Sequence, residues 1–381
     1  IHHHHHHHLH LLILICGKVK MDARRTLGWL SLTLLCLLSQ CLGFSVPQDG
    51  FSTGTVVVAG ANGRVGRFVV QELLTRPNAT VSVTAAVRDP SKAKNIFTEI
   101  LSPGQLERVK IKKCDLGNQK ELAAACEGAD AAIWCASGFS DQSSPINRAL
   151  ALFKVAFTPK ESLDIAAIRN LGAIFAGKEN GLCPGAPQVV LCSSAGVTRP
   201  DWPEDKKLKY PGAADIPIVR LNPLGILGVK AQGEEALRRT GAAYAVVRPC
   251  GLNDQHPAGR PVLSQGDMAV GRTSRRDAAS LLAAMLFEPG AAGKTFEAIA
   301  VAGLPKPRSY ADQLGRLLPD GEAVPEAALL ATYALLQQLV PGETLAPEQL
   351  AMGQTYEQLD RGEQGRLGAR GAEAPPIVQE Q

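Results

Sequence analysis

The most constraining feature of the sequence is a glycine-rich turn that follows a short run of β-branched residues. The run Val56–Val58 predicts a buried strand, and Gly60, Gly63 and Gly66 separate it from a segment with helical periodicity. In this order the first glycine permits a tight turn, the second lets the backbone approach a pyrophosphate, and the third permits close packing of helix on strand. The amide groups at the start of the helix would then bind the phosphates. The turn therefore predicts a Rossmann domain that binds a dinucleotide.

Beyond this turn the sequence alternates short apolar runs with longer segments of helical period, which indicates βαβ units and a parallel sheet. The predicted strands cover residues 55–59, 80–87, 108–114, 129–136, 188–193, 243–247 and 295–298. Two segments, 199–221 and 251–275, break this alternation. We therefore predict an α/β fold, a Rossmann doubly wound parallel sheet with a small C-terminal substrate or partner lobe built from these two segments at the carboxyl edge of the strands.

The predicted organisation has five parts. Residues 1–20 are interpreted as a translation artefact or tag, 21–53 as a targeting leader, 54–320 as the dinucleotide-binding domain with its lobe, 321–360 as a helical C-terminal extension and 361–381 as a disordered tail. Arg24 and Arg25 precede the apolar run Leu27–Leu38, which is typical of a signal peptide. Phe44 after the small residues resembles the bipartite leader of algae with secondary plastids. We expect a plastid protein, with the secretory pathway as the alternative, and no stable membrane span once the leader is removed.

Composition excludes several classes of function. The charge of +4 comes from 40 basic and 36 acidic residues without a basic block, and aromatic residues make up 5% of the chain, so nucleic-acid binding is not indicated. His256 is the one histidine outside the first ten residues, which argues against a histidine base or a multi-histidine metal site. The six cysteines after the leader form no C-x-x-C pair, so free thiols are expected rather than a zinc site or a disulfide framework.

The end of the second predicted strand bears on the choice of cofactor. Arg88 comes first after the strand and Lys92 lies close behind it, and such cations would neutralise a ribose 2′-phosphate. Asp89 between them could instead accept hydrogen bonds from a free 2′-hydroxyl. NADP(H) is therefore the predicted cofactor, and NAD(H) is the second choice.

Other predicted cofactor-binding positions lie in the glycine turn and at successive strand ends. Small residues at such ends let adenine and ribose lie against the backbone, and an aspartate there can accept a hydrogen bond from the adenine amino group. These positions are Asn62, Arg64, Val65, Asp115, Leu116, Ala136, Ser137, Gly138, Ser193, Pro249, Cys250 and Gly251.

Three stretches carry a family resemblance. They are the glycine turn, residues 230–252, and the segment that runs from Pro257-Ala258-Gly259 through Gln265-Gly266-Asp267 to Gly271. Over roughly residues 55–318 the chain resembles atypical or extended short-chain dehydrogenases/reductases of the NmrA-like group. It is similar to plastid and cyanobacterial members that include photosystem II assembly factors. Those assembly factors carry an inserted domain for which the interval between residues 194 and 224 is too short.

The resemblance implies a catalytic set with one member missing. In the family a serine after the fifth strand polarises a substrate carbonyl, and a tyrosine four residues before a lysine donates the proton. By position these are Ser194 and Lys230, and the lysine also bonds the nicotinamide ribose. Ile226 occupies the tyrosine position and cannot donate a proton. Tyr210, from the lobe, or Lys230 itself remain as alternative donors.

Two classes of function therefore stay open. One is an NADPH-dependent oxidoreductase of small carbonyl substrates with a non-standard active site. The other is a catalytically weak NADP(H)-sensing binding protein or assembly factor for a photosynthetic complex, whose protein partner binds the outer lobe or the C-terminal helix. A sugar-nucleotide epimerase-like enzyme is a third class, and it too would be expected to keep the tyrosine. Lys230 precedes Glu234 by four residues, a spacing that permits an ion pair on one helix face.

Overall fold

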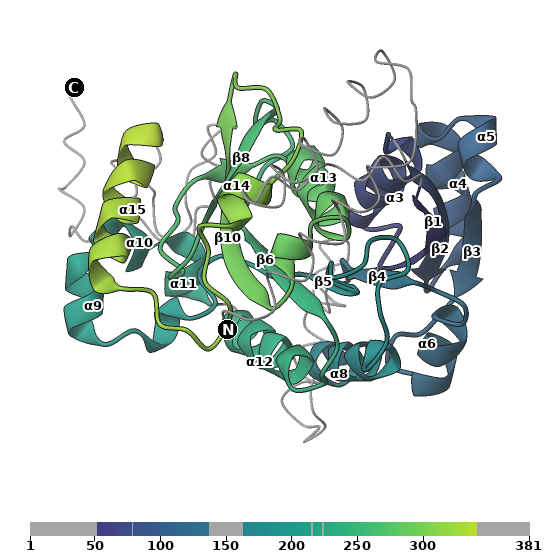
Figure 1. The fold of residues 1–381 in the computed structure, drawn as a ribbon, viewed down its shortest axis with the longest axis horizontal. Helices are drawn as coiled ribbons and strands as arrows, with labels where there is room; N and C mark the ends of the chain where they lie inside the picture. The colour runs from purple at the N-terminus through teal and green to yellow at the C-terminus, as the bar shows by residue number, and fades with distance from the viewer. Residues whose placement is uncertain (1–51, 78, 137–162, 215, 223–224, 341–381) are drawn as a thin grey trace, which may run out of the picture. The chain divides into compact units, whose positions relative to one another are not determined.

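A computed structural model describes residues 52–77, 79–136, 163–214, 216–222 and 225–340. Its centre is a sheet of eight strands in the order β3-β2-β1-β4-β5-β6-β10-β8 (Figure 1). All neighbours pair in parallel except β8, which runs antiparallel to β10. The strands are β1 (Ser52–Ala59), β2 (Ala79–Val87), β3 (Val109–Lys113), β4 (Ala131–Trp134), β5 (Val189–Cys192), β6 (Tyr244–Pro249), β8 (Gly259–Ser264) and β10 (Lys294–Ala302). The predicted doubly wound α/β sheet is confirmed.

The strand order changes direction between β1 and β4. In open sheets of this kind ligands bind outside the carboxyl ends of the strands at such a switch point. Each of the seven predicted strands corresponds to a strand of the sheet. The assignment of 251–275 to a separate lobe needs correction, because this segment contains β8, an edge strand of the main sheet. Pro261 interrupts the strand signal there, and proline is tolerated in β8 because the strand lies at the edge.

Helices cover both faces of the sheet. On one face α3 (Gly66–Thr75), α4 (Pro90–Ile100) and α13 (Arg275–Met285) bury Val70, Phe97 and Leu282 in a shared core. On the other face α6 (Gln119–Ala125), α8 (Leu163–Phe175) and α12 (Ile226–Arg238) bury Leu122, Leu171 and Leu237. These helices follow the lower side of the sheet in Figure 1. The apolar stripes needed for a two-sided sheet are therefore present on both sets of helices.

The predicted lobe segment 199–221 is helical. It forms η1 (Arg199–Asp201), α9 (Glu204–Lys209), α10 (Pro211–Ala214) and α11 (Pro217–Leu221). Trp202, Tyr210 and Ala213 of this segment share an apolar cluster with Met268 and with Tyr333 of α15 (Glu326–Leu339), the helix that follows the domain. Buried Arg199 donates hydrogen bonds to the carbonyl oxygens of Asp267, Ala213 and Ala269 at 2.6–2.9 Å. The lobe is thereby anchored to the 251–275 segment.

The remaining elements are short. They are α5 (Pro103–Leu106), β7 (Gly251–Leu252), β9 (Arg272–Thr273), η3 (Pro289–Ala291) and α14 (Ala311–Leu314). Among the helices that the structure describes, none is both long enough and apolar enough to cross a membrane. The predicted artefact segment, residues 21–51 of the predicted leader, the tail and the end of the predicted C-terminal extension lie outside the described residues. The last two residues of the predicted leader, Ser52 and Thr53, belong to β1.

Candidate dinucleotide-binding site

The glycine turn is packed so tightly that two of its positions have no room for a side chain. Gly60 has φ +76°, and a Cβ atom there would lie 2.8 Å from the Cα atom of Ala136. A Cβ atom on Gly66 would lie 2.2 Å from the carbonyl oxygen of Gly60. Gly63 has more room, because a Cβ atom there would meet one atom within 4 Å, the carbonyl oxygen of Gly60, at 3.1 Å. Gly60 and Gly66 therefore shape the turn, while Gly63 leaves its open side clear for a ligand.

The first turn of α3 suits an anion. Val65 is the N-cap residue and makes no side-chain capping bond, and the first turn contains no acidic residue. Asn62 and Val65 are partly exposed in the turn. Arg64 makes an ion pair with Asp254 at 3.1 Å, which ties the turn to the 251–275 segment. Backbone amides at such a helix start, together with the helix dipole, are the groups that bind phosphates.

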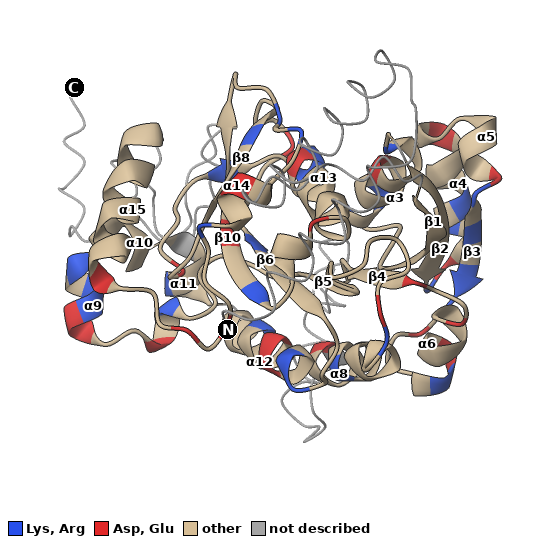
Figure 2. Ribbon diagram, viewed as in Figure 1, with Lys and Arg blue, Asp and Glu red and all other residues tan. Residues whose placement is uncertain are grey.

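At the end of β2 the side chains are predominantly basic. Arg88 is exposed, and Lys113, the last residue of β3, lies beside Val87 in the sheet register. Basic residues follow β3 along this edge (Figure 2). Asp89 is the N-cap of α4, where its carboxylate accepts a hydrogen bond from the backbone N–H of Lys92 at 3.0 Å. One carboxylate oxygen of Asp89 is thus occupied by its own helix.

The residues that follow β3 and β4 differ in exposure and in the groups they offer to a ligand. Asp115 is exposed and accepts a hydrogen bond from the backbone N–H of Gly117 at 3.0 Å, and Leu116 packs partly against the core. Ala136 follows β4 and abuts Gly60, as the close approach at that glycine shows. Ser137 and Gly138 lie outside the described residues.

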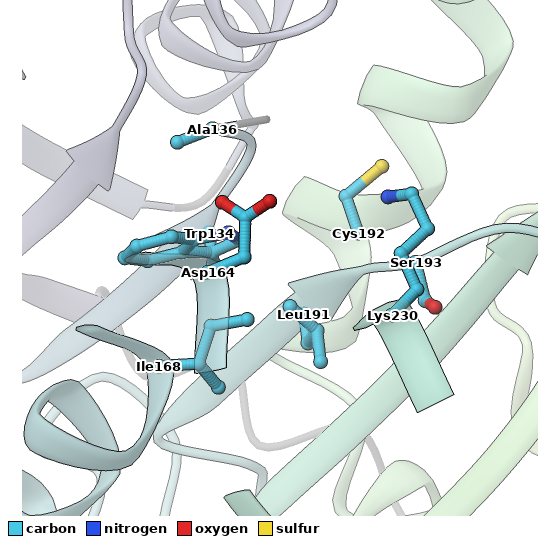
Figure 3. Close-up of a pocket in the computed structure, with 8 residues that line it drawn as sticks. All are labelled: Trp134, Ala136, Asp164, Ile168, Leu191, Cys192, Ser193 and Lys230. Atoms are coloured by element: carbon cyan, nitrogen blue, oxygen red, sulfur yellow. The ribbon is translucent and has the colours of Figure 1, made fainter. Parts of the chain in front are cut away.

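A pocket with an empty volume of about 260 Å³ opens at the carboxyl ends of β4 and β5 (Figure 3). This volume includes open solvent, and the enclosed part has room for about one water molecule, so the end of a cofactor or a small substrate would lie against the pocket rather than be enclosed by it. The pocket adjoins the glycine turn, because Ala136 lines the pocket and also lies against Gly60. Its lining residues are Trp134, Ala136, Asp164, Ile168, Leu191, Cys192, Ser193 and Lys230.

The structure brings Ser193, rather than Ser194, into the pocket lining. Ser193 is buried, and its hydroxyl donates a hydrogen bond to Glu234 at 2.5 Å. The hydroxyl of Ser194, the serine predicted to polarise a carbonyl, donates to the backbone oxygen of Ala195 at 3.0 Å. The sequence alone could not separate two adjacent serines at a strand end.

Lys230 lines the pocket from α12, and Ile226 begins this helix one turn earlier. The expected pairing of Lys230 with Glu234 is replaced by another network. Glu234 is buried and is bound by Arg248 at 2.6 and 3.0 Å and by Arg238 at 3.0 Å. Burial alone would lower the pKa of the Arg248 guanidinium, but the ion pair with Glu234 outweighs burial and raises it. Glu234 is therefore held in place by two arginines and Ser193.

Tyr210, the alternative proton donor, is placed elsewhere. It is buried in the lobe, where its ring meets those of Trp202 and Tyr333 edge-on at centroid distances of 6.0 and 5.1 Å. It does not line the pocket. The hypothesis that Tyr210 is an alternative proton donor is therefore corrected: the helical segment that carries it packs the ring into an apolar cluster away from the pocket.

The cysteines near the pocket are poor nucleophiles. Burial raises the pKa of the Cys192 and Cys135 thiols, although the Lys230 ammonium lowers both in part. Three further predicted cofactor-binding residues lie at the end of β6. Pro249 ends this strand and Gly251 begins β7. Cys250 between them is buried, and its thiol donates a hydrogen bond to the carbonyl oxygen of Ala269. These three residues do not line the pocket. Within the described residues no cluster of His, Cys, Asp and Glu could hold a metal ion.

Several pocket residues were missed by sequence reasoning. Asp164 and Ile168 lie on α8, whose start no motif marks. Trp134 ends a strand that was predicted, but nothing in the sequence shows which face it occupies. Arg248 offered a usable signal, since a charged residue inside a buried strand needs a partner.

Comparison with known proteins agrees with this geometry. The fold and the glycine turn define a Rossmann protein of the dinucleotide-binding class. A family model described as NAD(P)H-binding matches residues 60–289, and the chain belongs to that family. The predicted resemblance to atypical short-chain dehydrogenases/reductases is confirmed at this level.

Similar sequences come from plants. The chain is 30% identical over 273 residues to an uncharacterized chloroplastic protein of Arabidopsis thaliana, covering 70% of this chain and 83% of that protein. It is 28% identical over 263 residues to the chloroplastic protein TIC 62 of Pisum sativum, covering 65% of this chain but just 43% of TIC 62.

Among solved structures, a short-chain dehydrogenase/reductase of Veillonella parvula in complex with NADP is 14% identical, with a TM-score of 0.45 and coverage of 67% and 99%. An oxidoreductase of Lactococcus lactis is 17% identical, with a TM-score of 0.46 and coverage of 71% and 100%.

Proposed function

We propose that this chain is an NADP(H)-dependent plastid oxidoreductase of small carbonyl compounds with a non-standard active site. The observation that carries the proposal is the continuity of two features through Ala136. On one side of this residue lies a glycine turn that fits a pyrophosphate, and on the other lies a pocket containing Lys230. A dinucleotide whose pyrophosphate lies on the turn extends its nicotinamide end toward that pocket.

The preference for NADP(H) rests on charge at the end of β2. Arg88 is exposed there with Lys113 beside the strand end, so a 2′-phosphate would meet cations. Asp89 has one oxygen committed to capping α4, which supports NADP(H) over NAD(H). NAD(H) remains the second choice, to be decided by titration of both cofactors.

Location in a plastid is supported by the relatives. Proteins of Arabidopsis thaliana and Pisum sativum similar to this chain are named as chloroplastic. The arginine-flanked apolar run of residues 21–43 agrees with a leader that is removed on import. A fluorescent fusion in an alga with a secondary plastid, followed by sequencing of the mature N-terminus, tests this. An unprocessed cytosolic product would end the idea.

The chain's own residues supply binding, orientation and shielding. When bound, the cofactor supplies hydride to a substrate carbon. Lys230 binds the nicotinamide ribose and offers an ammonium group to the carbonyl oxygen on which charge develops. Trp134 and Ile168 form an apolar wall of the pocket that limits access of water.

A second function is favoured by a separate observation. Ile226 stands where the proton donor is expected, and the lobe and α15 expose leucines, with Leu208 80% and Leu335 52% exposed. We propose as the second candidate an NADP(H)-sensing binding protein or assembly factor whose partner contacts this lobe. Leu208→Asp should abolish co-purification with a plastid complex while NADPH affinity is kept. Unchanged co-purification would exclude the lobe surface around Leu208.

The primary proposal is tested by NADPH titration together with reduction of a panel of carbonyl compounds. We expect tight NADPH binding but slow turnover, because Ile226 replaces the tyrosine whose proton transfer contributes on the order of 10²–10⁴ in rate. Ile226→Tyr should increase carbonyl reduction, and Lys230→Ala should weaken NADPH binding. Robust turnover that Lys230→Ala leaves untouched would show that the active site lies elsewhere.

A further inference from the structure

The serine of the pocket cannot act as a hydrogen-bond donor to a substrate. A hydroxyl has one proton, and that of Ser193 is directed to Glu234 at 2.5 Å. Glu234 stays in place to accept this hydrogen bond, since Arg248 donates hydrogen bonds to both of its carboxylate oxygens. Toward the pocket Ser193 can therefore offer its oxygen as an acceptor alone. The donor and acid functions of the pocket must come from other lining residues.

Two lining residues can carry out proton chemistry on a substrate. Lys230 has three donors, and Asp164 has the one carboxyl group among the residues that line the pocket in the described part of the chain. Figure 3 shows them on opposite sides of the pocket, with the Asp164 carboxyl group above the indole of Trp134 and the Lys230 amine beside Cys192. A small carbonyl compound between them would meet an ammonium on one side and a carboxyl group on the other.

Both side chains are held by helices that pack closely. A Cβ atom on Gly233 of α12 would lie 3.0 Å from the Cδ1 atom of Ile168 and 3.8 Å from the backbone oxygen of Asp164. The missing side chain at residue 233 thus allows the first turn of α8 to approach α12 one turn after Lys230. Groups placed on packed helices keep their separation better than groups on loops, as proton transfer requires.

We propose that Asp164 is the acid–base residue of this site and takes the place of the absent tyrosine, with Lys230 stabilising charge on the substrate oxygen. The inference rests on the proposed oxidoreductase function. In reduction, hydride reaches the carbonyl carbon, the π-electron pair moves to oxygen, and the Asp164 carboxyl proton forms the new O–H bond. The resulting carboxylate takes up one H⁺ from the solvent, so each reduction consumes one proton, and the cofactor leaves oxidised. In alcohol oxidation the same atoms move in reverse.

The first test needs no turnover. The oxidised nicotinamide ring carries a positive charge that the reduced ring lacks, so a carboxylate at the pocket favours NADP⁺ over NADPH. Calorimetry should show that Asp164→Asn lowers the NADP⁺ affinity relative to that of NADPH by at least about fivefold. On acidification the wild-type ratio should approach that of the variant. Asp312→Asn, an exposed aspartate in the first turn of α14, should leave the ratio unchanged.

A purely structural role for Asp164 predicts a different result. An aspartate in the first turn of a helix stabilises the helix dipole. In that case Asp164→Asn would lower thermal stability slightly and leave both the NADP⁺/NADPH ratio and its pH dependence as in the wild type. That outcome overturns the assignment.

The second test is a single turnover with NADPH and phenanthrenequinone as the carbonyl probe. We expect Asp164→Asn to lower the hydride-transfer rate by about 10²-fold or more and to remove its acid-dependent limb. Ser193→Ala should keep a rate at least about tenfold higher than that of Asp164→Asn, because Ser193 cannot donate a proton to the substrate. Retention of the rate and pH profile in Asp164→Asn would overturn this inference and leave the oxidoreductase proposal standing. NADPH binding without any turnover by the wild type would overturn both.

Discussion

The two ends of the proposed cofactor site are held together by different forces. At the glycine turn, backbone atoms approach so closely that side chains are excluded at Gly60 and Gly66. At the pocket, Ser193 is fixed by Glu234, which is in turn fixed by Arg248 and Arg238. The first end depends on shape and the second on buried charge. A substitution therefore acts through sterics at one end and through an unpaired ion at the other.

The largest expected effect comes from breaking the buried ion pair. Arg248→Met leaves the Glu234 carboxylate, which is buried, without its bidentate partner. Loss of one partner of such a pair lowers the free energy of unfolding by about 3–5 kcal/mol. Urea unfolding measures the change. The matched control is Arg239→Met, which removes an exposed pair with Glu235 and should cost less than about 1 kcal/mol. Equal changes in the two variants would show that the network does not hold the pocket.

Steric exclusion at the turn is tested by Gly66→Ala. The added methyl group would press on the carbonyl oxygen of Gly60, so the turn must shift. We expect NADPH affinity to fall by about 100-fold, which corresponds to roughly 2.7 kcal/mol. Gly228→Ala on α12 is the control, because a Cβ atom there meets nothing within 4 Å. That control should raise stability by about 0.5–1 kcal/mol through helix propensity. Unchanged NADPH affinity in Gly66→Ala would refute the close-packed turn.

Charge recognition at the end of β2 gives a smaller, selective effect. Arg88→Ala should weaken NADPH binding by about tenfold, or roughly 1.4 kcal/mol, and change NADH binding less than twofold. Lys94→Ala, an exposed position on α4, serves as the charge-matched control. Cofactor titration by fluorescence distinguishes the two. Equal losses for NADPH and NADH would mean that Arg88 does not recognise a 2′-phosphate.

The free energy of unfolding is expected to depend on pH through Glu297 of β10, which interacts with Asp267, Arg248 and Arg199. Burial, and then repulsion by Asp267, raises the pKa of Glu297 from about 4.5 to about 7. Between these values the folded protein binds more protons than the unfolded chain, so stability falls as pH rises through the window. Glu297→Gln should remove this part of the slope, and exposed Glu99→Gln should not. Identical unfolding slopes between pH 4.5 and 7 in the wild type and Glu297→Gln would contradict the assignment.

The sequence predicted features that depend on local spacing. Gly60, Gly63 and Gly66 indicated the turn because their roles follow from backbone geometry, and the apolar runs indicated the strands of the parallel sheet. Strand β8 was missed because Pro261 hides the strand pattern and because its antiparallel pairing is made with a distant strand. The pocket was predicted in part, since Ala136, Ser193 and Lys230 were expected at the site, but the remaining lining residues were missed for a similar reason. Asp164, Ser193 and Lys230 come from three separate elements, and their meeting depends on how α8 and α12 pack.

Cofactor fragments test most directly the claim that the turn and the pocket bind one dinucleotide. Calorimetry would compare NADPH with adenosine 2′,5′-bisphosphate, which lacks the nicotinamide end, in the wild type and in Lys230→Ala. If the nicotinamide ribose lies at Lys230, the variant should lose at least about tenfold in NADPH affinity and bind the fragment as the wild type does. Equal losses for both ligands, or no loss for either, would contradict a site that runs from the glycine turn past Ala136 into the pocket.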